Sequence, residues 1–476
     1  MSTAVSFIPN TARIREVFEK QQKTALRLRT SSANERIGKI RRLRDAVLAR
    51  AETWYRAGQA DFKKPRAEVD LAEILPVVTE ANDAIKNLAS WMKPTSVMPT
   101  LLMAGTTSYV KYEPRGRCLI ISPWNYPLNL TFGPLVSAIA AGNTAILKPS
   151  EMTPHFSAEM SKLVAELFPE DEVAIFEGDA PVSQALLELP FDHIFFTGSP
   201  AIGKVVMAAA AKHLASVTLE LGGKSPTIID ASADLELAAQ NISFGKFANA
   251  GQTCIAPDHV FVHKSVKDAF VQRAREVLEK GYGKDGSPPS PHFAHVVNAR
   301  HTARLKALLD DAKAKGARVL HGGQVDEADH YIAPTLLDGI APDAKVMQEE
   351  IFGPILPILP FDDLDDVIAR INAEPKPLAL YVYSRDERAI EKVLNETSSG
   401  GACVNNAVVQ FIHGNLPFGG VNNSGIGNAH GHYGFRAFSH ERAVLKTQLK
   451  MTAMLYAPGP FPEKLRTLVN SFMKWL

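Results

Sequence analysis

The sequence predicts an α/β protein in which a doubly wound parallel sheet is followed by a second α/β domain. Between residues 118 and 221, short apolar runs alternate with segments of helical length, a pattern typical of strands joined by crossover helices. The same alternation resumes after Gly223. With 476 residues, 46% of them hydrophobic, the chain exceeds the usual size of one domain. We therefore expect two or three domains.

The segment before this alternation is expected to be helical. Apolar positions recur at helical spacing in residues 11–60, which predicts two amphipathic helices, and in residues 68–91, which predicts a third. Pro94 and Pro99 then interrupt the pattern. Residues 106–112 alternate between apolar and polar side chains, which predicts an edge strand or one arm of a hairpin. Arms of this kind often join subunits.

The first sheet is expected to place functional side chains directly after its strands. In a doubly wound parallel sheet, the ligand binds at the carboxyl ends of the strands. Five strands are predicted, at residues 118–122, 144–148, 173–177, 193–197 and 217–221. In the second unit the pattern predicts a strand at 226–230, a helix at 234–249, a strand at 259–263, helices at 266–280 and 300–315, and further α/β structure through Tyr383.

Charge and cysteine usage narrow the classes of function. Lysine and arginine total 52 and aspartate and glutamate 51, so no excess of positive charge favours nucleic-acid binding. Cys118, Cys254 and Cys403 are odd in number and far apart, which predicts neither a disulfide framework nor a CxxC metal site. No signal peptide is recognisable, and no apolar run reaches the roughly 18 residues of a membrane span. We expect a cytoplasmic protein with a small-molecule ligand.

Two glycine-rich patterns are similar to nucleotide-binding loops, and only one has the right context. Residues 281–286 match GxGxxG but follow a predicted helix and precede a Ser-Pro-Pro run, so no helix N-terminus faces a pyrophosphate. Residues 198–204 nearly form a P-loop, but Val205 stands where a hydroxyl would bind magnesium. Thr197, Gly198 and Ser199 nevertheless end a strand, and Gly203 lets the next helix pack closely. This turn is expected to hold the phosphates of a dinucleotide.

One cysteine has the sequence context of a nucleophile. Cys254 follows Gly251-Gln252-Thr253 and precedes Pro257 in a predicted loop. A thiolate in such a loop can attack a carbonyl carbon, and nearby N–H groups can hold the resulting oxyanion. Considered alone, Cys254 would more simply be a small buried hydrophobic residue.

Seven motifs in a fixed order resemble those of the NAD(P)-dependent aldehyde dehydrogenase superfamily. The motifs lie between residues 113 and 446 and read PWNYP (123–127), KPSE (148–151), FTGS (196–199), ELGGK (220–224), GQTC (251–254), EIFGP (350–354) and PFGG (417–420). Residues 254–258 and 416–440 are similar to the class 3 branch, which includes fatty aldehyde and bacterial coniferyl aldehyde dehydrogenases and tends to form dimers. The resemblance implies an aldehyde dehydrogenase-like fold and oxidation of a hydrophobic aldehyde, long-chain aliphatic or aromatic, to its acid.

The resemblance also implies a role for each matching residue. Cys254 would form a thiohemiacetal whose alkoxide is held by the Asn125 amide, hydride would pass to the nicotinamide, and Glu220 would activate the water that cleaves the thioester. Lys148 and Glu151 would contact the adenosine ribose. Further cofactor contacts are expected at Trp124, Ser150, Thr197, Gly198, Ser199, Gly203, Leu221, Glu350 (nicotinamide ribose) and Phe352 (nicotinamide ring). Because a carboxylate such as Glu151 repels a 2′-phosphate, NAD is favoured, although the branch also uses NADP.

Several alternatives remain beside this interpretation. The chain could be a binding protein that keeps the fold without turnover, or an acylating variant that passes the thioester to coenzyme A. His430, His432 and His440 have no carboxylate or cysteine at ligand spacing, so no metal is expected. A structural salt bridge is the default for Glu349. The apolar residues Phe244, Phe247, Val408 and Phe411 indicate either a hydrophobic pocket or core packing.

The motif order divides the chain into segments. We assign residues 1–98 and 113–223 to a dinucleotide-binding domain, 224–410 to a catalytic domain, 99–112 and 411–446 to oligomerisation or bridging, and 447–476 to a C-terminal tail. After Pro462, apolar residues fall at helical spacing between basic ones, which predicts an amphipathic helix too short to span a bilayer. This helix is expected to cover the substrate entrance or the partner subunit, with peripheral membrane contact as the alternative.

Overall fold

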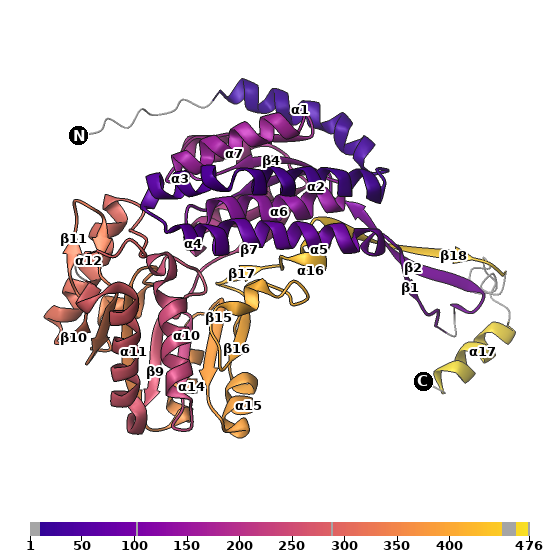
Figure 1. Cartoon of the computed structure of the whole chain (residues 1–476). Helices are drawn as coiled ribbons and strands as arrows, with labels where there is room; N and C mark the ends of the chain where they lie inside the picture. Colours follow the sequence, from indigo (N-terminus) through magenta and orange to yellow (C-terminus); the bar gives the residue numbers. More distant parts are fainter. Residues whose placement is uncertain (1–9, 101–102, 287–288, 450–462, 475–476) are drawn as a thin grey trace.

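Two open sheets with helices on both faces form the body of the protein, and a three-stranded arm projects from it (Figure 1). The structure, a computed structural model, describes residues 10–100, 103–286, 289–449 and 463–474. The predicted α/β class is confirmed.

The first sheet contains all five strands predicted between residues 118 and 221. They are β3 (Arg117–Ile121), β4 (Thr144–Lys148), β5 (Val173–Ile175), β6 (His193–Thr197) and β7 (Ser216–Glu220), and the order across the sheet is β17-β7-β6-β3-β4-β5. All pairs among these five are parallel, whereas the short β17 (Gly425–Ile426) is antiparallel to β7. The sheet is therefore doubly wound, as predicted.

Alternate side chains of these strands enter two separate cores. Cys118 and Ile120 pack against helices on one face, and Leu119 and Ile121 against helices on the other. The helices are α1 (Thr11–Leu28), α2 (Ala33–Ala49), α3 (Ala51–Phe62), α4 (Arg66–Val69), α5 (Leu75–Trp91), α6 (Pro127–Ala141), α7 (Pro154–Leu167), α8 (Ala180–Leu187) and α9 (Pro200–Ala211). Burial on both faces explains why the strands are almost wholly apolar.

The N-terminal helices differ from the prediction in two places. Residues 11–60 form three helices rather than two, because the chain leaves the helical conformation at Arg50 and restarts at Ala51. The single helix predicted at 68–91 is interrupted by a π-helical turn, η1, at Asp70–Ile74. Pro76, which has no backbone N–H, stands in the first turn of α5 and disturbs the regular bonding ladder there.

The second sheet has the order β10-β13-β14-β9-β8-β15-β16 and is parallel except at β10. Its strands are β8 (Pro226–Ile229), β9 (His259–His263), β10 (Arg318–His321), β13 (Thr335–Asp338), β14 (Ile355–Phe361), β15 (Ala379–Tyr383) and β16 (Gly401–Val404). The covering helices are α10 (Leu235–Phe247), α11 (Lys267–Tyr282), α12 (Ala299–Ala314), α13 (Lys345–Gln348), α14 (Leu364–Ala373) and α15 (Glu387–Glu396), and a small hairpin is formed by β11 (Val325–Asp326) and β12 (Tyr331–Ile332).

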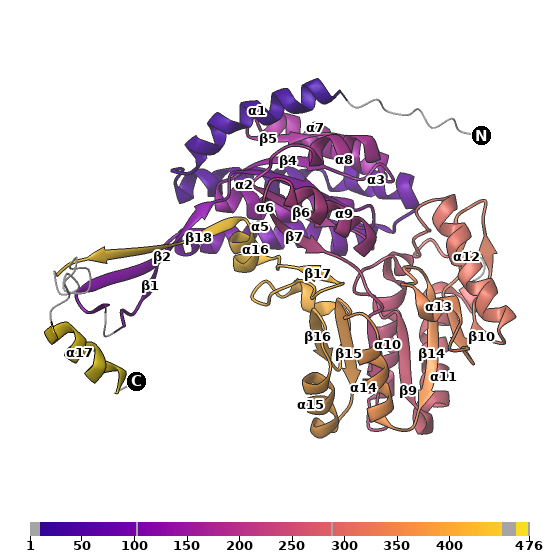
Figure 2. The ribbon, with the colours of Figure 1, turned by 180° about the vertical axis from the view of Figure 1, so that it is seen from behind.

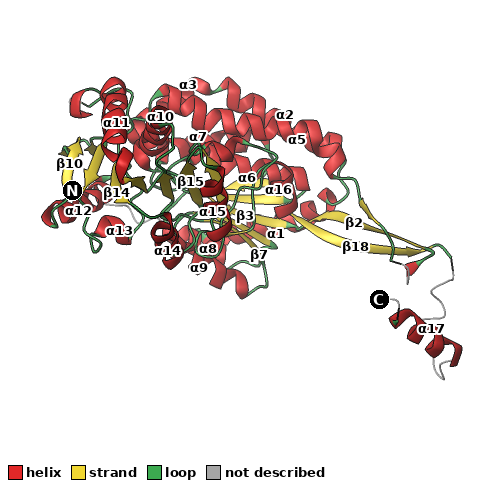
Figure 3. Cartoon of the chain, turned by 90° about the horizontal axis from the view of Figure 1, so that it is seen from below, coloured by secondary structure: helices red, strands yellow, loops and turns green. Residues whose placement is uncertain are grey.

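The arm consists of β1 (Thr95–Val97), β2 (Thr106–Pro114) and β18 (Ser439–Thr447), all antiparallel (Figures 1 and 3). The strand expected at residues 106–112 is thus the central strand of the arm and not an edge strand, because β1 and β18 pair with β2 on opposite sides. The helix predicted in the tail is α17 (Glu463–Met473), which lies beside the tip of the arm (Figures 1 and 2). Leu476, the last apolar residue of the predicted helix, lies outside the described residues. Within the described ranges, no helix is long and apolar enough to cross a membrane.

The connection between the two sheets fixes their relative polarity. The chain passes from the carboxyl end of β7 to the amino end of β8 through residues 221–225. So short a connection brings the carboxyl edge of the first sheet to the amino edge of the second. Residues that follow strands in the first sheet therefore meet residues that precede strands in the second.

Candidate active site

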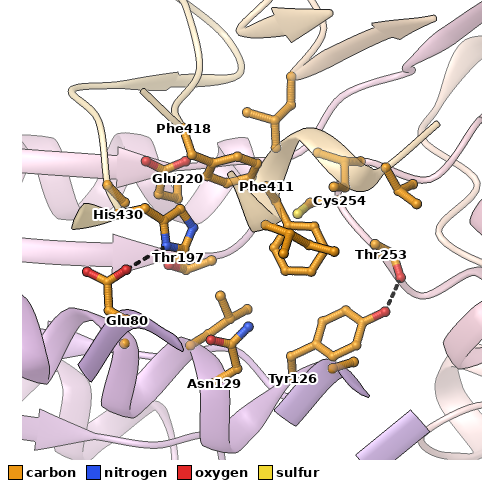
Figure 4. A pocket seen from close by; sticks show the side chains of 18 of the residues that line it. Glu80, Tyr126, Asn129, Thr197, Glu220, Thr253, Cys254, Phe411, Phe418 and His430 are labelled. Carbon is orange, nitrogen blue, oxygen red and sulfur yellow. Dashed lines mark hydrogen bonds and ion pairs between the residues drawn. The ribbon is translucent and has the colours of Figure 1, made fainter. Parts of the chain in front are cut away.

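A large apolar cavity opens where the two domains meet (Figure 4). Its volume is about 210 Å³. Both domains and the segment 408–434 contribute side chains, among them Leu71, Tyr126, Asn129, Thr197, Glu220, Phe244, Thr253, Cys254, Val408, Phe411, Phe418 and His430. Three of the four apolar residues noted in the sequence, Phe244, Val408 and Phe411, line it, whereas Phe247 is fully buried in the core.

The loop that carries Cys254 begins with a left-handed turn. After α10, the φ angles of Asn249, Ala250 and Gly251 are +53°, +52° and +71°. The first two are strained by roughly 1–2 kcal/mol each, since a Cβ disfavours this region. At Gly251 a Cβ would lie 2.3 Å from the carbonyl oxygen of Gly353, so this position requires glycine for space as well as conformation.

Cys254 lies in the cavity wall with its thiol protonated at neutral pH. Its pKa is raised to about 12, first by burial and then by the negative charges of Glu350 and Glu220. The backbone N–H groups of Cys254 and Ile255 oppose this shift. Attack by this sulfur therefore requires a nearby group that takes the thiol proton or stabilises the thiolate.

Glu220, the last residue of β7, is a buried carboxyl group with free acceptor oxygens. Burial raises its pKa well above the usual range. Neither carboxylate oxygen has a hydrogen-bond partner in the part of the chain that the structure describes. The Thr197 hydroxyl beside it in the cavity lining is likewise unpaired within those ranges. A carboxylate of raised pKa in an apolar cavity is suited to accept a proton from water or a thiol.

Asn125 is bonded to the cysteine loop. Its side-chain Nδ2 donates to the Gln252 carbonyl oxygen at 3.0 Å, two residues before Cys254. An amide nitrogen carries two hydrogens, so a second one remains for an oxyanion. Asn125 itself is almost fully buried and does not line the cavity, in contrast to Cys254 and Glu220.

Sequence reasoning missed the polar contacts around this amide. The backbone carbonyl oxygen of Asn125 accepts from the Lys64 ammonium at 3.0 Å and from the Asn249 side-chain amide at 2.9 Å. Beside it, the hydroxyls of Tyr126 and Thr253 hydrogen-bond at 2.6 Å and so join the Asn125 segment to the cysteine loop. Tyr126 and Thr253 stand within quoted motifs, whereas Lys64 belongs to no motif and gave no signal.

The carboxyl edge of the first sheet presents polar groups after β4. Lys148 is buried, and its ammonium contacts the Glu151 carboxylate at 3.3 Å and the Pro149 carbonyl oxygen at 2.8 Å. Burial lowers the pKa of Lys148, and Glu151 opposes that effect. The Ser150 hydroxyl accepts from the Met152 N–H, which fixes the turn.

The turn after β6 opens the N-terminus of α9. Ser199 caps this helix, accepting from the Ile202 N–H. A Cβ at Gly198 would meet the Phe196 ring at 2.5 Å, and one at Gly203 would meet the Leu221 side chain at 2.7 Å. Close packing of α9 on Leu221 thus requires glycine at 203, and the helix end can bind an anion.

The loop before β14 brings Glu350 and Phe352 to the same edge. A Cβ at Gly222 would lie 2.3 Å from a Glu350 carboxylate oxygen, so this glycine admits Glu350. Burial and the charge of Asp258 raise the pKa of Glu350 to about 8. The Phe352 ring stands edge to face on Trp124, with centroids 5.4 Å apart.

This loop is held by an ionic network that sequence reasoning anticipated only in part. Lys224 donates to the Val346 and Glu349 carbonyl oxygens, and Arg304 to those of Glu350 and Ile351. Arg304 also contacts the Glu349 carboxylate at 3.8 Å, which agrees with the structural salt bridge expected there. His301, which packs on Trp124, was not foreseen.

These residues fit a nicotinamide dinucleotide. The α9 N-terminus suits phosphate, Lys148, Glu151 and Glu350 offer polar partners for ribose hydroxyls, and the Phe352–Trp124 pair provides an aromatic wall.

The histidines considered as metal ligands have other contacts. His430 lies 3.5 Å from the Glu80 carboxylate, and His432 packs with Trp91 and Phe435. Elsewhere, Glu279, Asp285 and His321 place ligand atoms within 4.8 Å of one another. Glu279 is exposed and already contacts Arg275 at 3.8 Å.

Comparison with known proteins agrees with this geometry. The family model described as aldehyde dehydrogenase family matches residues 9–444. The chain is 42% identical to 4,4'-diaponeurosporen-aldehyde dehydrogenase of Staphylococcus aureus, covering 94% of this chain and 96% of the relative. It is also 42% identical to mouse aldehyde dehydrogenase family 3 member A2, covering 97% and 91%. A substrate-bound structure of Staphylococcus aureus AldH superposes with a TM-score of 0.92 at 40% identity, covering 96% of this chain and 99% of that one.

The chain therefore belongs to the aldehyde dehydrogenase family, in its class 3 branch, and oxidises aldehydes to carboxylic acids with NAD(P) as hydride acceptor.

Proposed function

We propose that Cys254 is the nucleophile, Glu220 the general base and Asn125 an oxyanion donor of this oxidation. The observation that carries the proposal is the cavity itself, which places the Cys254 thiol and the unpaired Glu220 carboxyl group in one apolar lining. Asn125 is bonded to the loop that presents the cysteine.

Each step follows from the environment of these groups. Solvent water takes the proton of the Cys254 thiol, the sulfur attacks the aldehyde carbon, and the alkoxide forms beside the Cys254 N–H and the Asn125 amide. A nicotinamide dinucleotide held by the α9 N-terminus, Glu350 and Phe352 would supply the hydride acceptor. A thioester then remains on Cys254, and Glu220 takes a proton from the water that cleaves it. Because the oxygens of Glu220 have no partner among the described residues, they are available for that water.

Single substitutions separate these roles. Cys254→Ala abolishes NADH formation, whereas Glu220→Gln gives a burst of about one NADH per active site and then stalls, because acylation proceeds without hydrolysis. Cys403→Ala, at a thiol outside the cavity lining, is the control and keeps the parent rate. Oxidation by Cys254→Ala at the parent rate would refute the proposal, as would unimpaired steady-state turnover in Glu220→Gln.

The cavity lining supports a hydrophobic aldehyde as substrate. Phe244, Phe411 and Phe418 contribute aromatic surface, and the Staphylococcus aureus relative is named 4,4'-diaponeurosporen-aldehyde dehydrogenase. Each methylene that enters such a cavity gains about 0.8 kcal/mol, so kcat/KM should rise about fourfold per carbon along a series of straight-chain aldehydes. A flat profile from propanal to decanal would exclude this substrate class.

We further propose a cytoplasmic homodimer that prefers NAD, with the domain division given by the sequence. Dimeric relatives exist, the cysteines are free thiols, and the arm offers strands away from the body (Figure 3).

The tail helix α17 contributes nothing to the cavity lining of its own chain in the ranges described, so it would act on the partner subunit. Sedimentation of the full chain tests the dimer, and a monomeric full chain would refute it. Steady-state kinetics of a variant lacking residues 460–476 tests the role of the tail, and unchanged kinetics in the truncated dimer would refute that role. Nothing in the comparisons supports membrane contact.

A further inference from the structure

We infer that the buried ion pair between Lys64 and Glu73 is a positioning device that holds the Asn125 amide in place beside the cysteine loop. The inference rests on the oxyanion role proposed for Asn125. It concerns residues outside every motif of the sequence and outside the cavity lining.

Lys64 connects the end of α3 to the catalytic segment. Its side chain is fully buried, and its ammonium donates to a Glu73 carboxylate oxygen at 2.7 Å and to the Asn125 carbonyl oxygen at 3.0 Å. The ammonium also faces the rings of Phe62 and Tyr126, 4.7 and 4.4 Å from their centroids. It is therefore held by a charge, a carbonyl and two aromatic faces, with no water-exposed surface.

Glu73 binds the same segment at the start of α6. It stands in the π-helical turn η1, and its second carboxylate oxygen accepts the backbone N–H groups of Leu128 and Asn129, both at 3.1 Å. These groups open α6, where a carboxylate is favoured by the helix dipole. The pair thus fixes the chain at residue 125 and again three residues later.

The cysteine loop is bonded to the same backbone carbonyl oxygen of Asn125 that Lys64 contacts. The Asn249 amide donates to the Asn125 carbonyl at 2.9 Å and to the Gln252 carbonyl at 3.2 Å, and the Asn125 amide donates to the latter. Glu68, in α4, accepts the Asn249 backbone N–H at 2.9 Å. This buried polar network joins three distant segments and restrains the strained turn before Cys254.

Stability alone does not account for such a pair. Replacing a buried ion pair by neutral groups of similar size is often neutral or stabilising, because desolvation offsets most of the attraction. A role in geometry explains its place, since a shift of about 1 Å in a catalytic group can lower the rate roughly 100-fold.

The test uses a double replacement that removes both charges of the Lys64–Glu73 pair together. In Lys64→Met/Glu73→Gln, the side-chain amide oxygen introduced at position 73 can still accept the α6 N–H groups, but the Asn125 carbonyl loses its ammonium partner. The control is Lys39→Met/Glu172→Gln, which neutralises another buried pair, between Lys39 of α2 and Glu172 just before β5, with a separation of 2.6 Å. With a hydrophobic aldehyde and saturating NAD, we expect the NADH burst rate to fall at least tenfold in the first variant and to stay within twofold in the control. A burst rate within twofold of the parent in a folded Lys64→Met/Glu73→Gln variant would overturn the inference.

A second readout distinguishes positioning from general damage. Alkylation of Cys254 by iodoacetamide displaces iodide at carbon and forms no oxyanion, so its rate should be unchanged while the burst falls. A parallel fall in both rates would refute the positioning role. If the double variant proves insoluble, Glu73→Gln alone, which keeps Lys64 on the Asn125 carbonyl, serves with the same two readouts and a smaller expected loss.

A double-mutant cycle with Asn125→Ala completes the test. If Lys64 and Glu73 act through the Asn125 side chain, their replacement slows the burst no further once that side chain is gone. Fully additive losses would mean that the pair acts elsewhere and would overturn the inference. If Asn125→Ala alone leaves the burst rate unchanged, the proposed oxyanion role itself is refuted, so the two failures are told apart.

Discussion

The substitution Gly251→Ala tests how closely the cysteine loop packs on the loop before β14. The added Cβ would lie 2.3 Å from the Gly353 carbonyl oxygen and 2.9 Å from that of Lys246. Since real Cβ contacts stay beyond 3.0 Å, the two loops must move apart by about 0.7 Å, and both atoms are backbone. The left-handed φ of +71° adds strain of roughly 1–2 kcal/mol.

A matched substitution isolates the packing effect. Gly316, after α12, also has a positive φ, +93°, but nothing lies within 4 Å of its Cβ position. Gly316→Ala should therefore lower the melting temperature slightly and leave kcat/KM unchanged. Gly251→Ala should lower the melting temperature further and reduce kcat/KM by roughly 10- to 100-fold, because Cys254 and the Glu350 loop separate. Equal effects in both variants would refute the reasoning.

Two further predictions concern electrostatics. Because the pKa of Cys254 is raised to about 12, its alkylation rate in the cofactor-free enzyme should rise about tenfold per pH unit from pH 7 to 10 without a plateau. Because the pKa of Glu350 is about 8, Glu350→Gln removes a charge only above that pH and should speed alkylation between pH 8 and 10, whereas Glu349→Gln, at an exposed carboxylate, should not. A plateau near pH 8 in the parent enzyme, or no faster alkylation of Glu350→Gln at pH 10, would contradict this. Glu151→Gln should lower the KM for NADP relative to NAD about fivefold, from the ~1 kcal/mol between unit charges 4 Å apart in water, and an unchanged ratio would disprove the ribose assignment.

Local patterns predicted much of the fold and the candidate residues. All five strands of the first sheet lie where apolar runs stand between 118 and 221, because burial on both faces makes such runs continuous. Cys254 and Glu220 were recognisable since each stands in a short motif whose neighbours, such as Gly251, have a local backbone function. The helix boundaries at Arg50 and at the π turn were not predictable, because helical periodicity continues through both.

The sequence by itself predicted which residues would carry the chemistry, and it determined which of them follow or precede a strand. Only the tertiary structure decided that the two groups meet: Glu220 ends β7, Cys254 precedes β9, and residues 221–225 turn the carboxyl edge of one sheet toward the amino edge of the other. It also brought Lys64 and Glu73 beneath Asn125, 61 and 52 positions away along the chain. The physical reason is that motifs record local backbone geometry, whereas contacts across such separations depend on strand order and on the connection between domains.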